Sequence, residues 1–453
     1  MNSNQINYLR DIVGPKNSCT TKEELLVYEY DATLLKGAPE LILFPETTEQ
    51  VSKILAYAHQ EGAGTNLSGG TIPDKGGIVL VMTKMNKVLE IDYANHVAVV
   101  EPGVINQEFQ DILMPNGYYY LPDPASMKAC TMGGNVGECS GGPRCLKYGV
   151  TRDYILGMEM VLSNGEVVIL GSKHQINPDP LDLTKFMVGS EGVMGVFTKL
   201  FLKISKITEA KKTMLSTFNS VKDASRAVAN IISAGVVPTT LELMDNLLIN
   251  CAEDFTGLGL DRTADALLLI EVDGLKEELD GQVDVIKKVC EKNKVKEFKI
   301  AQSAKEVDLL WTARRTVIGA VARKRPSYSM QDVTVPRNKL PDIVEEIVNI
   351  SAEYSLPIGV LAHAGDGNLH PLVLFDERDK EEVQKVHDAE VRICKKALAL
   401  GGTLSGEHGI GLLKKPYLNL QFPPETLNIK KQLMLAFDPK NILNPDKIME
   451  VGN

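Results

Sequence analysis

The spacing of hydrophobic residues in the first half of the chain predicts alternating helices and strands. Apolar residues recur at helical spacing over residues 51–58, which predicts an amphipathic helix. Thr47 and Gln50 stand at its start and offer a capping box. Apolar runs over residues 78–82 and 157–162 predict buried strands. This half of the chain therefore mixes helices with sheet.

From about residue 206 the pattern becomes a doubled strand, helix, strand unit. Strands are predicted over 213–218, 239–244, 266–272 and 295–300, and helices over 220–234 and 276–293. Ser220 is the expected cap of the first helix, and Gly235 its stop. The doubled unit predicts a ferredoxin-like α+β domain.

One short segment predicts a hairpin that carries two histidines. Asp366 and Gly367 lie between two apolar runs, and an Asp-Gly pair in that setting is a strong hairpin signal. A two-residue turn would set His363 directly opposite His370, with Cβ atoms about 5 Å apart on one face. Two imidazoles at that separation can bind one divalent ion. The alternative is a plain hairpin with solvent-facing histidines.

Composition narrows the class of protein. The 453 residues suggest two or three domains, and 44% hydrophobic with 24% charged residues is typical of a globular chain. A net charge of -10 argues against nucleic acid or an anionic membrane surface as the main partner. No apolar run is long enough to span a bilayer, and the first residues lack signal-peptide blocks. We therefore expect a cytoplasmic protein.

The seven cysteines favour reduced thiols over a disulfide framework, because their number is odd and they are scattered. Cys130, Cys139 and Cys145 form the closest group, and their spacing matches neither zinc sites nor iron–sulfur clusters. If the protein handles electrons, it uses an organic cofactor.

Three glycine-rich segments indicate that the backbone approaches a ligand closely. They lie at residues 62–70, 133–142 and 189–195. The first segment has interleaved Thr and Ser, which suits a phosphate cradle, but it matches neither the Rossmann nor the Walker pattern. An ordinary flexible loop is the alternative for the first segment alone. An extended dinucleotide lying across a sheet would account for all three segments.

Four motifs carry a family resemblance. They are Gly64-Thr65-Asn66-Leu67-Ser68-Gly69-Gly70, Gly133-Gly134-Asn135, Gly189-Ser190-Glu191-Gly192 and the closing segment from Phe437 to Pro445. The chain resembles the FAD-linked oxidases of the vanillyl-alcohol oxidase type, in the branch of D-lactate dehydrogenases and the glycolate oxidase flavin subunit. The resemblance implies an α+β fold: a two-lobed FAD-binding domain (1–205), a ferredoxin-like cap or substrate domain (206–405), and a segment returning to the FAD domain (406–453).

The resemblance also implies which residues hold FAD, with the pyrophosphate on the 64–70 loop. The expected set is Gly64, Thr65, Asn66, Leu67, Ser68, Gly69, Gly70, Pro122, Ser126, Gly133, Gly134, Asn135, Gly141, Tyr148, Glu191, Gly192, Val196 and Asn444. The family's short strand and Arg ahead of this loop have no counterpart, because the helix runs into Gly62. Its covalent flavin histidine is also absent from the loop, so we expect non-covalent FAD.

A substrate site follows from the same resemblance. It implies that Arg315, with Arg314 the less favoured neighbour, pairs a substrate carboxylate through a guanidinium fork. Glu407 and His408 are adjacent and cannot both point the same way from extended backbone. One natural division, which the resemblance also implies, gives Glu407 to the metal as third ligand beside the two histidines, and His408 to the substrate as base. Two histidines and one carboxylate suit Zn, Fe or Mn.

The expected function is FAD-dependent, metal-assisted oxidation of a small D-2-hydroxy acid. The first expected substrate is D-lactate, which would be oxidised to pyruvate. Electrons would pass to a protein such as an electron-transferring flavoprotein, with electron bifurcation as a sub-hypothesis. Glycolate or D-2-hydroxyglutarate are the alternative substrates. Two other classes are a flavin electron-transfer subunit without its own substrate and a metal-binding structural module. An electron-transfer subunit has no need of the histidines, and a metal-binding structural module leaves the glycine-rich segments unexplained.

Overall fold

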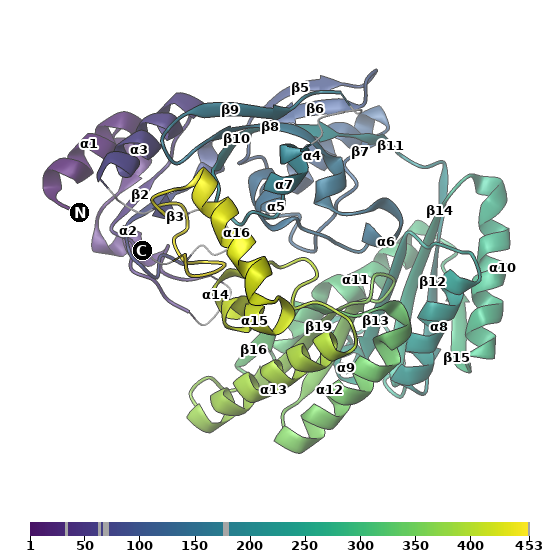
Figure 1. The fold of residues 1–453 in the computed structure, drawn as a ribbon. Coiled ribbons are helices and arrows are strands. Elements are labelled where there is room, and N and C mark those ends of the chain that lie inside the picture. The colour runs from purple at the N-terminus through teal and green to yellow at the C-terminus, as the bar shows by residue number, and fades with distance from the viewer. Residues whose placement is uncertain (32–34, 62–64, 67–71, 175–180, 452–453) are drawn as a thin grey trace. The chain divides into compact units, whose positions relative to one another are not determined.

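The computed structural model describes residues 1–31, 35–61, 65–66, 72–174 and 181–451. Contacts between residues divide the chain into two units. The first unit comprises Met1–Ser140, Val150–Ile207 and Glu407–Asn453, and the second comprises Gly141–Gly149 and Thr208–Gly406. The chain therefore enters the second unit twice and returns to the first unit at residue 407 (Figure 1).

The first lobe of the first unit is a small mixed sheet covered by helices. Its strands, in sheet order, are β1 (Ser18–Cys19), β2 (Leu41–Leu43), β4 (Ile78–Leu80) and β3 (Thr65–Asn66). Strands β2, β4 and β3 run parallel, and β1 is antiparallel. The helices are α1 (Ser3–Val13), α2 (Lys22–Leu26) and α3 (Thr48–Glu61). Strand β3 lies inside the first glycine-rich segment, where no strand was expected.

Helix α3 starts as its sequence predicts. The Thr47 side chain accepts a hydrogen bond from Gln50 N at 3.2 Å, while the Gln50 side chain accepts from Glu46 N at 2.7 Å rather than from Thr47 N. The Thr47 half of the predicted capping box is thus confirmed, and the reciprocal bond reaches one residue further back.

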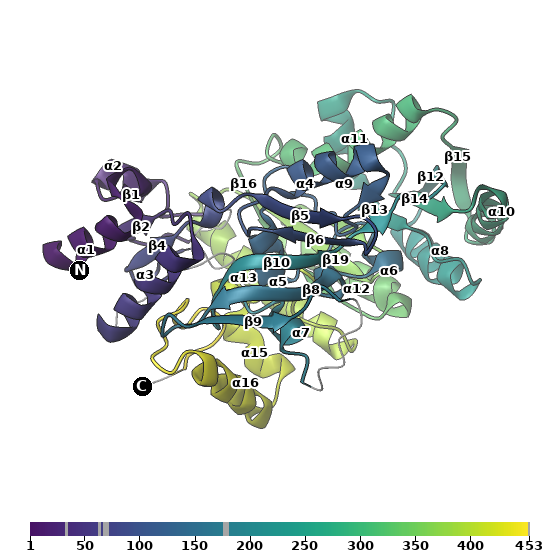
Figure 2. The ribbon, with the colours of Figure 1, turned by 90° about the horizontal axis from the view of Figure 1, so that it is seen from above.

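The second lobe is a five-stranded antiparallel sheet, whose strands Figure 2 shows side by side. In sheet order they are β5 (Val88–Asp92), β6 (Val97–Val100), β10 (Val196–Lys203), β8 (Ile155–Val161) and β9 (Val167–Gly171). The helices of this lobe are α4 (Asn106–Leu113), α5 (Met132–Glu138) and α7 (Leu183–Met187). A small pair, β7 (Tyr118–Tyr119) with β11 (Ser205–Lys206), completes it.

The last stretch of the chain completes the core of the first unit. Its helices are α14 (Gly411–Lys414), α15 (Leu418–Gln421) and α16 (Pro424–Phe437). Beyond α16, Ile442 and Leu443 pack in one cluster with Leu41, Ile54 and Val161. Residues from the two lobes and from the chain's end therefore share one apolar core.

The second unit is built on one large antiparallel sheet. In sheet order its strands are β15 (Val295–Ile300), β12 (Ala210–Phe218), β14 (Ala266–Gly274), β13 (Thr240–Asp245), β18 (Ile358–His363), β19 (Asn368–Phe375) and β16 (Ser327–Met330), with β17 (Val333–Thr334) also paired to β19. The order β15-β12-β14-β13 is that of a ferredoxin-like unit. The predicted fold is confirmed, and β13 carries the sheet onward to the histidine hairpin.

Helices cover both faces of this sheet, and its central strands are therefore buried on both sides. The helices are α8 (Val221–Ser233), α9 (Asn246–Thr256), α10 (Lys276–Lys292), α11 (Ala304–Val321), α12 (Leu340–Tyr354) and α13 (Lys380–Ala399), with α6 (Cys145–Tyr148) from the inserted segment. Helices α9 and α11 pack together over Met244, Leu361 and Leu372. Within the described ranges, none of the helices has the length and apolar character needed to cross a membrane.

The hairpin forms, with a register that differs from the predicted one. His363 lies opposite Asn368, and His370 lies opposite Leu361. The loop therefore holds four residues, 364–367, and the pairing shifts by two positions. Because strand side chains alternate with period two, a shift of two keeps both histidines on one face. The same-face prediction is confirmed, and the direct opposition of the histidines is corrected to a diagonal.

Gly367 closes this loop in a conformation that suits only glycine. Its φ is +75°, and an added Cβ would overlap the backbone oxygen of Val335. We predict that Gly367→Ala lowers the free energy of unfolding of the second unit by about 2–4 kcal/mol, from left-handed strain plus overpacking. Denaturant titration followed by tryptophan fluorescence measures this.

The matched control is Gly281→Ala, in an exposed turn of α10 with nothing near the added methyl group. It should stabilise the second unit by about 0.5–1 kcal/mol. Equal midpoints for the two variants would contradict the role given to Gly367.

Candidate active site

Two buried histidines of the second unit lie together at the tip of the β18–β19 hairpin. The ring centroids of His363 and His370 are 5.1 Å apart, and one ligand nitrogen of each lies within 4.8 Å of the other. Both residues are less than a tenth exposed. Their side chains share the sheet face of Leu361 and Leu372, which α9 and α11 cover.

A carboxylate and an arginine hold the first histidine. Glu242 on β13 pairs directly with His363 on β18, and the two side chains meet at 2.7 Å between Oε1 and Nδ1. Arg314 on α11 donates to Glu242 Oε2 at 2.6 Å. The contact with Glu242 holds the imidazole of His363 at its Nδ1 side and so helps to fix the orientation of the ring.

The carboxyl group of Glu242 is ionised although it is buried. Burial alone would raise the pKa of Glu242, but the neighbouring charges of His363 and Arg314 and their hydrogen bonds outweigh it and hold the pKa below its usual value. The carboxylate therefore stays ionised inside the protein, with a cation on one side and an imidazole on the other.

A second buried carboxylate lies beside His370. Asp332 has no exposed surface, and one of its oxygens lies within 4.8 Å of a His370 ring nitrogen. Its Oδ2 accepts from Ser405 Oγ at 2.6 Å and from Gly406 N at 2.9 Å. Asp332 thereby fixes Ser405 and Gly406, which lead into residue 407.

Glu407 and His408 follow Gly406 directly in the chain. Gly406 is the last residue of the second unit, and its Cα packs so closely on Asn368 and Thr334 that no side chain fits there. Covalent geometry keeps the Cα atoms of the next two residues within about 4 and 7 Å of Gly406. Gly406 is thereby fixed within the second unit, and the predicted third ligand and the predicted base are the two residues that follow it in the chain.

The two arginines of α11 face different ways, because successive helical residues are rotated by about 100°. The Arg314 side chain is 6% exposed and lies on the sheet side. The Arg315 side chain is 65% exposed and stacks over the Trp311 ring at 5.3 Å. Only Arg314 therefore faces the group that contains His363.

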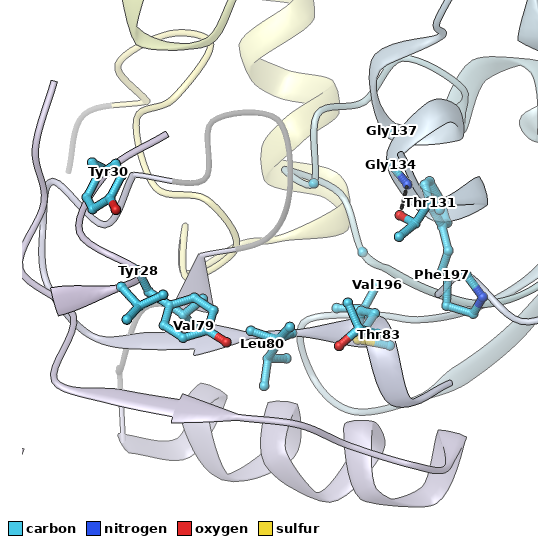
Figure 3. A pocket seen from close by; sticks show the side chains of 17 residues that line it. Tyr28, Tyr30, Val79, Leu80, Thr83, Thr131, Gly134, Gly137, Val196 and Phe197 are labelled. Carbon is cyan, nitrogen blue, oxygen red and sulfur yellow. Dashed lines mark hydrogen bonds between the residues drawn. The ribbon is translucent and has the colours of Figure 1, made fainter. Parts of the chain in front are cut away.

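In the first unit a cavity of about 330 Å³ lies between β4 and α5. Figure 3 shows Val79 and Leu80 on one side and Thr131 and Gly134 on the other. Gly133, Gly134, Gly137 and Gly192 contribute backbone without side chains, and the remaining lining is largely apolar. Such a surface suits a flat, extended cofactor that needs close backbone approach.

Two buried donors lie in the chain beside residues that line this cavity. Asn135 is on the same short helix as the lining glycines, and Ser190 precedes Gly192. Asn135 Nδ2 and Ser190 Oγ are buried and have no hydrogen-bond partner within the described part of the chain. Buried donors of this kind are normally satisfied, but neither residue lines the cavity, so the fit to a cofactor such as FAD rests on the bare glycine backbone of the lining.

The other residues expected to bind FAD lie in several settings. Gly64, Leu67, Ser68, Gly69 and Gly70 lie outside the described residues, and Thr65 and Asn66 form β3. Val196 begins β10 and lines the cavity. The Pro122 carbonyl accepts from Asn106 Nδ2, and Ser126 is exposed. Gly141 and Tyr148 belong to the second unit. The side chain of Asn444 donates to the Glu191 carbonyl at 2.7 Å.

Sequence reasoning did not assign a role to Glu242 or Asp332. Glu242 lies inside the strand segment Thr-Leu-Glu-Leu-Met, whereas Asp332 lies in the two-residue link between β16 and β17. Acidic residues are rarely buried without a partner. For Glu242 an isolated acid in the predicted strand 239–244 was the available signal, but its partners come from segments far away in sequence; no predicted strand contained Asp332.

Two family descriptions match the chain. Residues 39–171 match a FAD binding domain, and residues 207–448 match the C-terminal domain of FAD linked oxidases.

Relatives match over nearly the whole chain. The glycolate oxidase subunit GlcD of Bacillus subtilis is 41% identical over 448 residues, which cover 97% of this chain and 95% of that protein. A D-lactate dehydrogenase of Anaerostipes hadrus is 31% identical over 455 residues, covering 97% and 94%. Among solved structures, p-cresol methylhydroxylase with substrate bound has a TM-score of 0.81 at 16% identity, covering 99% and 97%. At that identity the likeness shows the fold alone.

Tyr148 lies in the segment Gly141–Gly149, which belongs to the second unit. Its hydroxyl donates to the Asp273 carboxylate at 2.8 Å, and Lys147, Thr208 and Thr239 donate to the same carboxylate. Burial alone would raise the pKa of Asp273, but the hydrogen bonds from Lys147, Thr239 and Tyr148 hold it below its usual value.

We therefore predict that Asp273→Asn lowers the melting temperature of the second unit at pH 7. A lowered pKa contributes stability above the unfolded value of about 3.9, and that stability is lost as pH falls through the folded pKa. The gap between wild type and variant should thus close below about pH 4. Calorimetry from pH 7 to 3.5 measures it. Asp284→Asn, exposed on α10, is the control and should match wild type; a gap that persists in acid would refute the prediction.

Proposed function

Because the chain belongs to the family of FAD-linked oxidases, we propose that it oxidises a small 2-hydroxy acid to the 2-oxo acid, with D-lactate as the first candidate substrate. The observation that carries the proposal is the buried pair of His363 and His370, with Glu242 on the same sheet face and Arg314 of α11 bonded to Glu242. A purely electron-transferring subunit has no use for this group.

We propose that His363, His370 and Glu407 hold one divalent metal, Zn, Fe or Mn. Neutral imidazole and carboxylate are the ligands these ions prefer. The distance between the two histidines supports this, and so does the bond between Glu242 and His363 Nδ1, which orients the imidazole.

When bound, FAD supplies the hydride acceptor and the metal supplies positive charge beside the substrate. His408, as neutral imidazole, takes the proton of the substrate hydroxyl while the Cα hydrogen leaves as hydride, so the carbon–oxygen double bond of the product forms. The buried setting of the two histidines excludes water from the far side of the site. Electrons leave the protein through a second redox protein, for which an electron-transferring flavoprotein is our candidate.

An arginine of α11 orients the substrate carboxylate. The sequence favoured Arg315, but the structure turns that side chain toward solvent, stacked on Trp311. Arg314 faces the histidine group, and its bonds to Glu242 use Nε and Nη2, which leaves Nη1 for a substrate oxygen. We therefore propose Arg314 for this role.

Glycolate is the second candidate substrate. It differs from lactate by one methyl group, and the relative that is 41% identical is named as a glycolate oxidase subunit. A methyl group in an apolar pocket is worth only about 1–3 kcal/mol, so both acids are to be compared directly. D-2-hydroxyglutarate adds a second carboxylate and needs a further cation.

The proposal is tested by mixing the anaerobic FAD-loaded protein with D-lactate, L-lactate, glycolate and D-2-hydroxyglutarate, and following flavin absorbance. We expect fast bleaching by D-lactate, slower or equal bleaching by glycolate, and none by L-lactate. Chelation should stop bleaching without releasing FAD, and added Zn²⁺ or Mn²⁺ should restore it. Bleaching by L-lactate alone, or indifference to chelation, would overturn the proposal.

The same assay tests the base. His408→Ala should lower the rate of flavin reduction about 10²–10⁴-fold, the usual contribution of a positioned base, while FAD content is retained. His387→Ala, on the exposed side of α13, is the matched control and should reduce at the wild-type rate.

The two arginines give a separate prediction. Arg314→Lys keeps the charge beside Glu242 but loses the planar fork, so the KM for the hydroxy acid should rise about 10–100-fold. Arg315→Lys should change KM less than about threefold. Steady-state kinetics with an artificial acceptor measures both, and the opposite pattern would restore the assignment to Arg315.

A further inference from the structure

Two buried carboxyl groups of the first unit take no part in the chemistry proposed above. Glu138 is the last residue of α5. Both of its carboxyl oxygens are buried and have no hydrogen-bond partner within the described ranges. Glu191 is 4% exposed and has a φ of +48°, which is unusual for a residue other than glycine. A buried, unpartnered carboxyl group and a strained neighbour call for a physical reason.

The side chain of Glu191 accepts hydrogen bonds from the backbone that follows His408. Its Oε1 accepts from Ile410 N at 2.7 Å, and its Oε2 accepts from Gly411 N at 2.7 Å. Asn444 Nδ2 donates to its carbonyl oxygen at 2.7 Å. Hydrogen bonds to an ionised carboxylate are roughly twice as strong as neutral ones. Both acceptor atoms of the side chain are therefore occupied, and the glutamate acts as a two-point clamp.

Both carboxyl groups converge on Gly409. An added Cβ at this position would meet Glu138 Oε2 and Glu191 Oε1. Gly409 also has a φ of +83°, so the turn needs glycine for its conformation as well as for space. The residue next to His408 is thus enclosed by two acidic side chains from distant parts of the chain.

Electrostatics separates the roles of the two acids. Burial, together with the charge of Glu191, raises the pKa of Glu138 well above its usual value. Burial also raises the pKa of Glu191, while the N–H groups of Ile410 and Gly411 and the charge of Lys414 lower it in part. Two like charges do not both persist in such a site. Glu138 therefore carries the proton, and Glu191 carries the charge that the two N–H groups stabilise.

We infer that Glu138 and Glu191 are positioning residues, which brace the turn from Gly409 to Gly411 and thereby orient His408. This rests on the proposed function, in which His408 is the base. Glu191, which its motif assigned to FAD, here acts on the protein's own backbone. Glu138 fills the space beside Gly409 without adding a second negative charge next to the base.

The test uses the FAD-loaded full chain and reads amide hydrogen exchange in the peptide covering residues 407–414. In Glu191→Gln one acceptor oxygen remains for two N–H groups. We expect exchange of the Ile410 and Gly411 amides to rise at least tenfold, and flavin reduction by D-lactate to fall at least tenfold. FAD content and the substrate Kd should stay within twofold. Glu108→Gln, on the exposed face of α4, is the matched control.

A second pair of variants decides the matter if Glu191→Gln does not fold. Glu138→Ala should also raise exchange in this peptide and slow reduction. Glu138→Gln should restore both toward wild type, because the amide reproduces the shape and neutrality of the protonated acid. A general loss of stability would not be rescued in this way.

Three results would overturn the inference: unchanged exchange at residues 410–411 in Glu191→Gln, loss of FAD from that variant, or Glu138→Gln as slow as Glu138→Ala. Failure of the proposed function has a different signature. If His408→Ala reduces flavin at the wild-type rate, His408 is not the base, yet the exchange data still report whether the two acids brace the turn.

Discussion

The ionised carboxylate of Glu242 is the constraint on which the second unit depends. A buried charge costs several kcal/mol unless partners surround it, and Glu242 is only 1% exposed. Arg314 and His363 supply the partners. They come from α11 and β18, while Glu242 itself lies on β13. One carboxylate therefore ties three elements into a fixed arrangement, and it also sets the orientation of an imidazole that we propose as a metal ligand.

Much of the fold was predictable because hydrophobic periodicity records which face of each element is buried. The predicted strands and helices of residues 213–300 appear within a few residues of their expected bounds, with Ser220 as the cap of α8. The hairpin register was not predictable in the same way. The Asp-Gly pair signals a tight turn, yet the loop includes Ala364 and Gly365 as well. Gly367 packs against the backbone at Val335, a contact that no local pattern in the sequence encodes.

The candidate site also has features that the sequence predicted and features that it did not. Side-chain alternation was enough to put His363 and His370 on one face. The partners of those histidines could not be predicted from the sequence, because Glu242 lies 121 positions from His363 in the chain. The choice between Arg314 and Arg315 depends on the rotation of α11 about its axis, which its weakly amphipathic sequence leaves open. The role of Glu191 is a similar case, because a motif indicates that a residue matters without indicating which atoms it binds.

The packing of residues 442–447 has a consequence for the order of events at the ribosome. Ile442 and Leu443 lie in the core formed by Leu41 and Ile54, and Lys447 pairs with Asp74 at 2.7 Å. These residues are synthesised only after the whole of the second unit. At about 5–20 residues per second, the second unit alone takes roughly 10–40 s to emerge. The N-terminal lobe is therefore the first to appear and the last to be completed, and until then the apolar side chains that Ile442 and Leu443 cover lack those two partners.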